Sequence, residues 1–297
     1  MSNNNIVKGV LLVGLGAASY GLLATFVKLA YAKGYTTAEV TASQMVLGIL
    51  AVALLWQMQK WGKAQAVKAM RNDILYLVLS GTSIGFTTVF YYLAVKYVPV
   101  SVGIVLLMQS VWMGVLAEWL MTKKTPSPKK ILAVLVVIAG TLLATNLLKT
   151  DALPHWHGIA WGLLAAISYT VTMFAGHRVA LNLPPVQRSL YMLYGAAVVA
   201  LVFTAITWPG HFNVEILYTW GIPLSIFGTL LPPLLMNAGF PKIPMGLGRI
   251  VSAVELPVSV TMAYIVLHET VSAPQWFGIA LILGAIVLMN ISHKKQA

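Results

Sequence analysis

The stretch GLGRIVSAVELPVSV, from Gly246 to Val260, lies between long apolar flanks and carries two charged residues, Arg249 and Glu255. In a soluble protein these charges would be ordinary. Inside a membrane each charge is costly to bury, and intramembrane charges usually mark a site of function. The fold therefore depends on which solvent surrounds this stretch, and the composition of the whole chain answers that question.

The composition is that of a membrane protein. Of the 297 residues, 59% are hydrophobic and 9% are charged, and the mean hydropathy is +0.84. A soluble domain carries about 25% charged residues, so this chain has more apolar side chains than one core can bury. We expect a polytopic α-helical membrane protein. The lack of cysteine excludes disulfides and thiolate metal sites, and neither a metal nor a cofactor is expected.

Ten apolar runs are long enough, at about 20 residues each, to cross the hydrocarbon core. Short polar or Pro/Gly-rich segments separate most of them, and no connection is long enough to form a soluble domain. The predicted spans are 9–31, 37–57, 74–95, 100–121, 129–148, 157–179, 186–207, 216–238, 244–267 and 274–291.

The distribution of positive charge predicts an orientation. A net charge of +12 is also found in proteins that bind nucleic acid. With ten spans, however, fourteen Lys and Arg residues fall at the end that holds both termini, four fall at the opposite end, and Arg249 is left inside a span. The positive-inside rule places the lysine-rich end in the cytoplasm. We therefore expect cytoplasmic termini, with the lipid bilayer and a small-molecule substrate as partners and no nucleic acid.

The two halves of the chain resemble each other when one is shifted by 144 to 149 residues. GLGAASYG, which begins at Gly14, recurs as GLLAAISYT at Gly162. VIAGTLLATNL, which begins at Val137, recurs as LILGAIVLMNI at Leu281. The matches occur in the same order, which favours an internal repeat. The alternative is a chance similarity between helices rich in glycine, alanine and leucine.

A repeat of five helices sets the expected architecture. The first unit is predicted to cover residues 1–150 and the second 151–297. An odd number of helices turns the second copy upside down in the membrane. Inverted repeats are common in transporters, whose substrate sites lie near the membrane midplane between the repeats. The predicted fold is an all-α integral membrane protein with ten transmembrane helices, as two inverted five-helix repeats around a central cavity.

One segment carries a resemblance to a known family. HETVSAPQWFGIALILGAIVL, from His268 to Leu288, has a Glu, a short turn, and a helix that opens with Gly and continues Leu-Ile-x-Gly. This pattern resembles the end of the EamA repeat of the drug/metabolite transporter superfamily, and VELPV resembles the Glu-Pro element in the helix before it. The first repeat departs, with Lys123 and Lys124 where a Gly-Glu is expected. Overall the chain looks most like bacterial amino-acid exporters of the YddG type, which implies a secondary transporter of the bacterial inner membrane.

The span 244–267 holds the main candidate site residues. Gly248, Ser252 and Glu255 follow one another at helical spacing and form a small, polar stripe. Along a helix Arg249 and Glu255 would be about 9 Å apart in rise and roughly 120° apart in direction, so they are not expected to pair. Arg249 would attract a carboxylate and Glu255 an ammonium group, and together they suit a zwitterion. The alternative is structural, with each charge held by polar groups of neighbouring helices.

Other polar and aromatic residues within the spans are candidates to line the cavity. For each the alternative is structural, because a tryptophan can pack against lipid and a hydroxyl can bond to its own helix. Pro232 and Pro233 remove two backbone donors and predict a kink, and Pro257 is a further candidate hinge. The remaining candidate substrate-binding residues are Asn237, Gln109, Trp112, Tyr92, Thr88, Tyr20, Trp161 and Tyr169.

The span 74–95 contains a GxxxG motif at Gly81 and Gly85, for which close helix packing is the favoured interpretation. Tyr91 and Tyr92, later in the same span, are candidates for the aromatic walls of a cavity, which would favour aromatic or other large apolar substrates.

No ATP-binding or catalytic motif occurs in the chain. The predicted function is secondary transport of small metabolites, above all the export of amino acids, by alternating access. The alternatives are a multidrug or quaternary-ammonium exporter and, more distantly, an integral-membrane enzyme. An enzyme would need acids or histidines clustered at one membrane face, and the sequence shows none, so the chain is not expected to be an enzyme.

Overall fold

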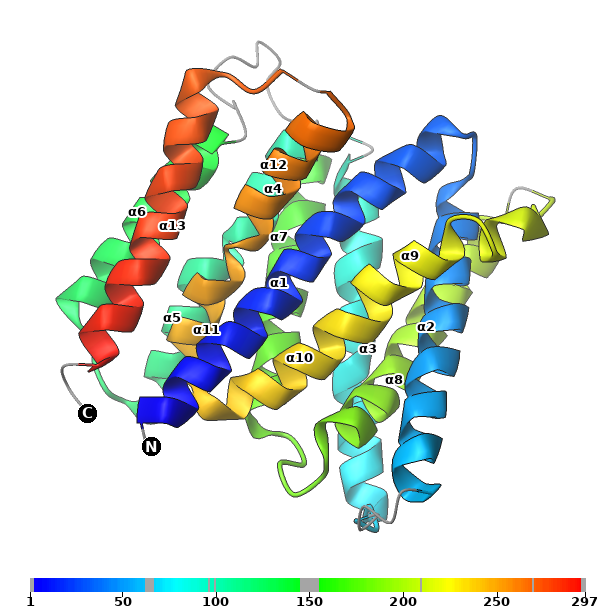
Figure 1. The fold of residues 1–297 in the computed structure, drawn as a ribbon, viewed down its shortest axis with the longest axis horizontal. Coiled ribbons are helices and arrows are strands. Elements are labelled where there is room, and N and C mark those ends of the chain that lie inside the picture. Colours follow the sequence, from blue (N-terminus) through cyan, green and yellow to red (C-terminus); the bar gives the residue numbers. More distant parts are fainter. Residues whose placement is uncertain are drawn as a thin grey trace.

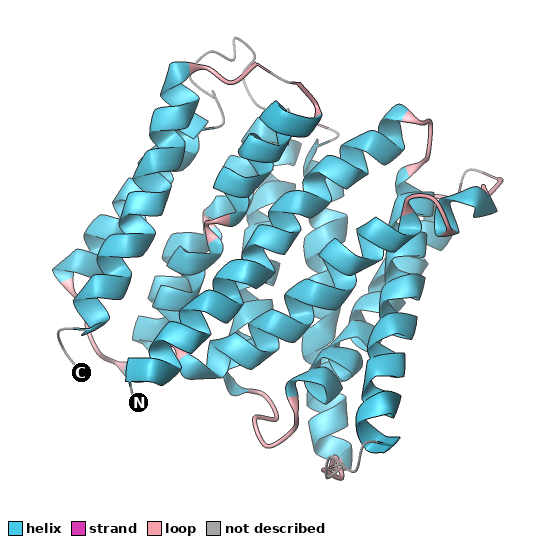
Figure 2. Ribbon diagram, in the orientation of Figure 1, coloured by secondary structure: helices cyan, strands magenta, loops and turns pink. Residues whose placement is uncertain are grey.

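The computed structural model describes residues 3–61, 67–95, 97–98, 100–144, 155–208, 210–268 and 270–294, and within them the regular structure is entirely helical (Figures 1 and 2). Helix α1 begins and α13 ends at the same end of the bundle. We call this the lysine-rich end, because it carries Lys8, Arg71 and the basic residues between α5 and α6.

Within the described residues, the first half of the chain forms six α-helices and the second half forms seven. The first six are α1 (Asn3–Ala32), α2 (Thr37–Trp61), α3 (Arg71–Val95), α4 (Val100–Met108), α5 (Ser110–Thr122) and α6 (Pro128–Ala144). The others are α7 (Trp156–Arg178), α8 (Pro185–Ile206), α9 (Gly221–Ser225), α10 (Leu231–Gly239), α11 (Met245–Ser252), α12 (Glu255–Val266) and α13 (Ala273–Lys294).

Most of these helices have the length and hydropathy of membrane spans. Among the described residues, eight helical segments are long and apolar enough to cross a membrane, and Ala273–Leu288 is a shorter apolar helix. Large apolar side chains such as Leu54 and Val198 are exposed on the outside of the bundle, as expected for a surface that faces lipid. The chain is therefore a multi-pass membrane protein, and three of its predicted single helices are interrupted along their length.

The helices of the two halves pack in an exchanged pattern. Helix α3 of the first half packs against α7 of the second, and the equivalent helix α10 packs against α1. Helix α6 packs against its own equivalent, α13, and α2 against α8. The helices of the two halves are thus interleaved rather than separated into two bodies.

Glycines allow α3 and α8 to approach closely. A Cβ placed on Gly81 would overlap the backbone carbonyl of Met192, and one placed on Gly195 would overlap that of Val78. The backbones are thus in direct contact, as is usual where small residues line a membrane-helix interface. This confirms the packing interpretation of the GxxxG motif. Gly85 likewise faces Val199 and the Ala196 carbonyl.

We expect Gly81→Ala to lower the thermal unfolding midpoint in detergent, because the new methyl group would have to push α8 away. Overpacking of this kind costs about 1–3 kcal/mol. Gly284→Ala is the matched control, since open space surrounds a Cβ at that position in α13. Its midpoint should stay the same or rise slightly, because alanine favours a helix over glycine. Equal midpoints for the two variants would contradict the close α3–α8 contact.

Candidate functional site

The break between α11 and α12 divides the predicted span 244–267. Helix α11 ends at Ser252 and α12 begins at Glu255, with a tight turn at Ala253 and Val254. Pro257 explains the break, because it has no N–H to donate to the Ala253 carbonyl and its ring clashes with a carbonyl at that position. The Leu256 N–H bonds to the Ala253 carbonyl instead, at 3.2 Å. The candidate hinge Pro257 thus lies in the first turn after the break.

The break between α4 and α5 lies at Gln109, which a shift of 145 residues aligns with Val254. No proline causes it. The Gln109 N–H bonds to the Leu106 carbonyl at 3.1 Å, and its side-chain Nε2 donates to the Val105 carbonyl at 3.0 Å in place of the helical bond. Trp112 Nε1 donates to Gln109 Oε1 at 3.0 Å. The candidate site residue Gln109 therefore stabilises the broken backbone.

Both breaks occur at equivalent points of the two repeats and inside spans. Backbone that leaves the helical pattern at this depth is tolerated only where protein or water can satisfy it. Paired broken helices in two repeats are the usual position of a transporter's substrate site. We therefore take the region around the α4–α5 and α11–α12 breaks as the candidate site.

Arg249 lies in the last turn of α11 and is completely buried. Its guanidinium carbon is 4.6 Å from the centre of the Tyr169 ring, and Nη2 is 3.8 Å from the Met108 sulfur. The atoms Nε and Nη1 have no hydrogen-bond partner. Gly114 of α5 makes room for the arginine, since a Cβ there would lie 3.1 Å from Arg249 Cβ.

Glu255 is the first residue of α12 and is half-buried. Within the described residues its carboxylate forms no hydrogen bond and no ion pair, so Arg249 and Glu255 do not pair. The spacing predicted from the sequence applies to one continuous helix, whereas the break between α11 and α12 lies between the two residues. The charge of Glu255 acts on Arg249 and on three tyrosines, Tyr20, Tyr91 and Tyr169. Helices α1 and α7 pack against α11, and α1 also packs against α12, so helices of both repeats contact the segment that holds the two charges.

Helix dipoles favour the two charges where they stand. The C-terminal end of a helix carries partial negative charge and the N-terminal end partial positive charge. Arg249 is next to the end of α11 and Glu255 is at the start of α12. This offsets part of the cost of burial, but it provides no partner for the unbonded guanidinium nitrogens.

Several other candidates bond to the protein framework instead. Ser252 Oγ donates to the Gly248 carbonyl at 2.8 Å, and Thr88 Oγ1 donates to the Ile84 carbonyl at 3.2 Å. Asn237 is buried and donates to Ser189 Oγ at 2.9 Å. These bonds occupy the side chains within or between helices, so they fit the structural alternative.

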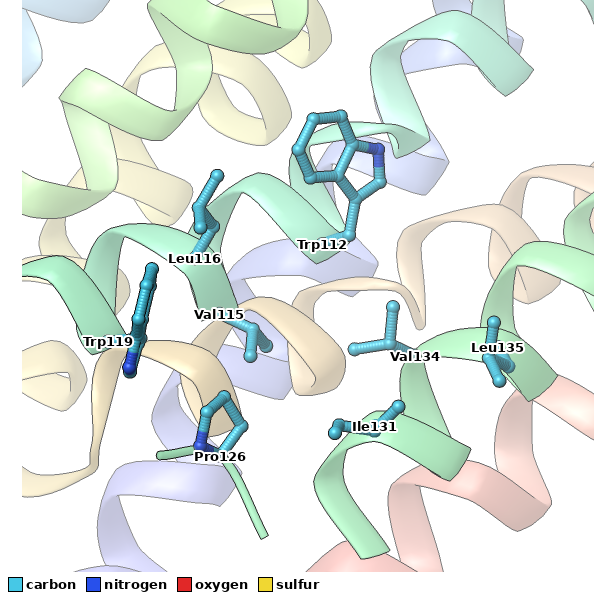
Figure 3. A pocket seen from close by; sticks show the side chains of 8 residues that line it. All are labelled: Trp112, Val115, Leu116, Trp119, Pro126, Ile131, Val134 and Leu135. Carbon is cyan, nitrogen blue, oxygen red and sulfur yellow. The ribbon is translucent and has the colours of Figure 1, made fainter. Parts of the chain in front are cut away.

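The aromatic candidates lie in different surroundings. Trp161 of α7 stacks on Phe90 of α3, with ring centres 5.6 Å apart. Trp112 of α5 is 38% exposed and lines an apolar pocket between α5 and α6 (Figure 3). It therefore does not belong to the group around Arg249. The side chain of Tyr92 lies outside the described part of the structure.

The two candidate kink residues, Pro232 and Pro233, are buried at the start of α10. A π-helical turn, Ile226–Leu230, directly precedes them and separates α9 from α10. Ser19 Oγ of α1 donates to the Phe227 carbonyl within this turn, at 3.2 Å. The predicted span 216–238 is thus irregular where its prolines remove backbone donors.

Comparisons with known proteins agree with this architecture. The model of the EamA-like transporter family matches residues 7–146 and again 156–291. This chain belongs to the EamA-like transporter family. The family is one of membrane transporters, and its two matches confirm the resemblance to EamA-type repeats. A solved crystal structure is similar to this EamA-like transporter, with 18% identity, a TM-score of 0.75 and coverage of 93% of this chain and 97% of the other. No curated protein matches the sequence.

Two buried or partly buried charged residues that join helices of the EamA-like transporter were not singled out by sequence reasoning. Arg188 of α8 is buried and donates to the carbonyls of Gly176 at 2.7 Å and Asn237 at 2.9 Å. The Asn237 carbonyl lacks its helical donor because the residue four positions later is Pro241. That proline is the sequence signal for such a partner.

The second missed residue is Glu118 of α5. Its carboxylate accepts from the Gly246 N–H at the start of α11, at 2.5 Å, and from Lys130 Nζ of α6, at 3.0 and 3.1 Å. One acid therefore joins three helices at the lysine-rich end. An acidic residue inside the apolar run 100–121, with Lys130 across a short loop, is the signal in the sequence.

The two repeats of the EamA-like transporter are in close contact at the lysine-rich end, which we call the closed end. There α5 packs against α11, and every residue of α11 is buried. At the other end the equivalent helices, α4 and α12, do not pack against each other to a comparable extent, and in α12 the buried residues are Leu256 and Pro257. The carboxylate of Glu118 joins the two helices of this contact, α5 and α11.

We expect Glu118→Gln to weaken the contact between α5 and α11, because it removes the negative charge that accepts the bonds from Gly246 and Lys130. Charge-assisted bonds contribute about 1.5–3 kcal/mol, and partial exposure of this pair lowers that value. The chain has no cysteine, so Leu247→Cys in buried α11 supplies one labelling site. Its maleimide reaction should be several-fold faster with Glu118→Gln and unchanged with the exposed control Glu215→Gln. An unchanged rate for Glu118→Gln would exclude this role.

Proposed function

We propose that this chain is a secondary transporter that exports amino acids across the bacterial inner membrane by alternating access. The observation that carries the proposal is the presence of two opposite charges, Arg249 and Glu255, that have no ion-pair partner among the described residues. Arg249 is fully buried with two guanidinium nitrogens unbonded, and the Glu255 carboxylate has no bonded partner within the described chain. Both lie beside paired helix breaks.

The chemistry of the site suits a zwitterion. An unpaired buried cation is costly, and a substrate carboxylate would supply the missing acceptors for Nε and Nη1. The substrate ammonium group would pair with Glu255. Tyr20, Tyr91 and Tyr169 come from three helices, and the charge of Glu255 acts on all three, while the ring of Tyr169 lies beside the Arg249 guanidinium. Their aromatic rings favour amino acids with aromatic or other large apolar side chains.

The membrane arrangement follows from the same proposal. With α6 and α13 counted as spans, the chain crosses the membrane ten times, as two inverted repeats of five. The positive-inside rule places the lysine-rich end in the cytoplasm. The state that is closed at that end then exposes its site to the opposite side, and release of an exported amino acid would occur from this state.

A multidrug or quaternary-ammonium exporter is the second candidate. Glu255 with three tyrosines near it favours this alternative, because aromatic faces and an acid both attract cations. For such a substrate Arg249 would be repulsive. The two candidates therefore differ in what they require of Arg249.

Transport by purified protein in liposomes tests the proposal with labelled amino acids and organic cations. We expect Arg249→Met and Glu255→Gln each to reduce amino-acid flux by about 10- to 100-fold, the equivalent of one charge-assisted hydrogen bond. The exposed controls Arg178→Met and Glu215→Gln should transport normally. If no amino acid is moved by the wild type, the proposal fails. Cation flux that needs Glu255 but tolerates Arg249→Met would select the second candidate.

Thermal unfolding of the same variants separates substrate binding from a structural role. If Arg249 serves the substrate, Arg249→Met removes an unpaired buried charge, and the unfolding midpoint should stay the same or rise. If Arg249 holds the helices together, the midpoint should fall by several degrees along with transport. A fall in the midpoint would remove the main support for the amino-acid site.

A further inference from the structure

A pocket on the outer face of the bundle is not used by the proposed transport site. It lies between α5 and α6 and has a volume of about 280 Å³ (Figure 3). Apolar side chains form its walls, among them Trp112, Leu116 and Trp119 of α5 and Ile131 and Leu135 of α6. These side chains are all between 38% and 59% exposed, so the pocket opens outwards rather than towards Arg249.

The surroundings of the pocket are the bilayer. Helix α5 belongs to a segment with the length and hydropathy of a membrane span, and α6 packs beside it. What fills an outward-facing apolar pocket at this depth is a lipid acyl chain. A pocket with rigid tryptophan walls also offers more contact area to a chain than the smooth surface of a helix does.

Positive charge collects at one end of the pocket. Pro126, in the loop between α5 and α6, is one of the lining residues, and this loop contains Lys123 and Lys124 and precedes Lys129. The three lysines are exposed and have no ion-pair partner among the described residues, whereas Lys130 is held by Glu118. Basic residues beside a crevice between membrane helices are typical of sites for anionic lipid headgroups.

The backbone conformation at the end of α5 fixes the position of Lys123. Lys123 ends α5 in the left-handed conformation, with φ of 55°, and its N–H donates to the Trp119 carbonyl at 2.8 Å. A residue other than glycine rarely adopts this conformation. A cation at this point also meets the partial negative charge of the helix end. Lys123 and Lys124 are the residues at which the first repeat departs from the EamA pattern, so the charge is a property of this chain.

We propose that the pocket between α5 and α6 binds an anionic phospholipid, with an acyl chain against Trp112, Trp119 and Leu135 and the phosphate beside Lys123, Lys124 and Lys129. The site is separate from the proposed amino-acid site. It requires only that the lysine-rich end lies at a membrane surface that contains anionic lipid.

Native mass spectrometry of the full chain tests this site, with phosphatidylglycerol and phosphatidylcholine of the same acyl chains as probes. We expect the wild type to retain phosphatidylglycerol at least about tenfold more strongly, since each lysine near an anionic headgroup contributes to binding. Lys123→Gln, Lys124→Gln and Lys129→Gln together should remove this preference. The matched control, Lys8→Gln, Lys68→Gln and Arg71→Gln, removes the same charge from the same end and should keep it.

A second variant tests the acyl-chain half of the site. Leu135→Trp should fill the pocket and reduce retention of both lipids, with wild-type thermal stability as the check that the chain is folded. The proposal is overturned by equal retention of the two lipids by the wild type, by an equal loss in the two triple variants, or by unchanged retention in Leu135→Trp. If inorganic phosphate displaces phosphatidylglycerol completely, the acyl chain contributes nothing and the proposal also fails.

Discussion

Every backbone N–H and carbonyl group inside a bilayer must find a partner within the protein, because lipid offers none. This chain interrupts its helices within spans and meets that requirement with side chains. Gln109 bonds to the Val105 carbonyl at the α4–α5 break, Arg188 to the Asn237 carbonyl that Pro241 leaves without a donor, and Ser19 to the Phe227 carbonyl in the π-helical turn. Much of the buried polarity of the bundle is therefore explained by its irregular backbone.

After these bonds, few of the candidate polar side chains are left to bind a substrate. Ser252, Thr88 and Asn237 are occupied by bonds to neighbouring groups, whereas Arg249 keeps two unbonded nitrogens and the Glu255 carboxylate has no bond within the described chain. The ends of α11 and α12 offset part of the cost of these charges without neutralising them. Two opposite charges that lie close in the sequence, and that do not bond to each other, suit a ligand that carries both complementary charges.

The membrane class and the repeat could be predicted from the sequence, because they depend on composition and on similarity between the two halves of the chain. The surroundings of Gln109 and Trp112 could not. No proline or glycine marks Gln109, and its role depends on a side chain that folds back onto its own helix. The break also changes the direction of all later residues, so a helical face drawn through 100–121 does not predict where Trp112 points.

Contacts between segments that are distant in the sequence could not be predicted either. Arg188 is buried and donates to carbonyls of two other helices, α7 and α10, which its position in the sequence does not reveal. The partner of Glu118 is a backbone N–H more than a hundred residues away, at Gly246. Such pairings depend on tertiary structure, which residue identity at one position does not encode.

The two breaks also differ in how they are held, and this bears on how the repeats can move. Pro257 has no N–H, so a regular helix cannot form across α11 and α12 in any conformation of the chain. The break at Gln109 rests on side-chain bonds, and the Gln109 N–H can return to the Val105 carbonyl when the amide leaves it. Of the two breaks, only the one between α4 and α5 can become a regular helix without loss of a backbone hydrogen bond. Helix α5 also carries Glu118, whose carboxylate accepts from the Gly246 N–H of α11, so a change in the α4–α5 break would act directly on the contact between the two repeats.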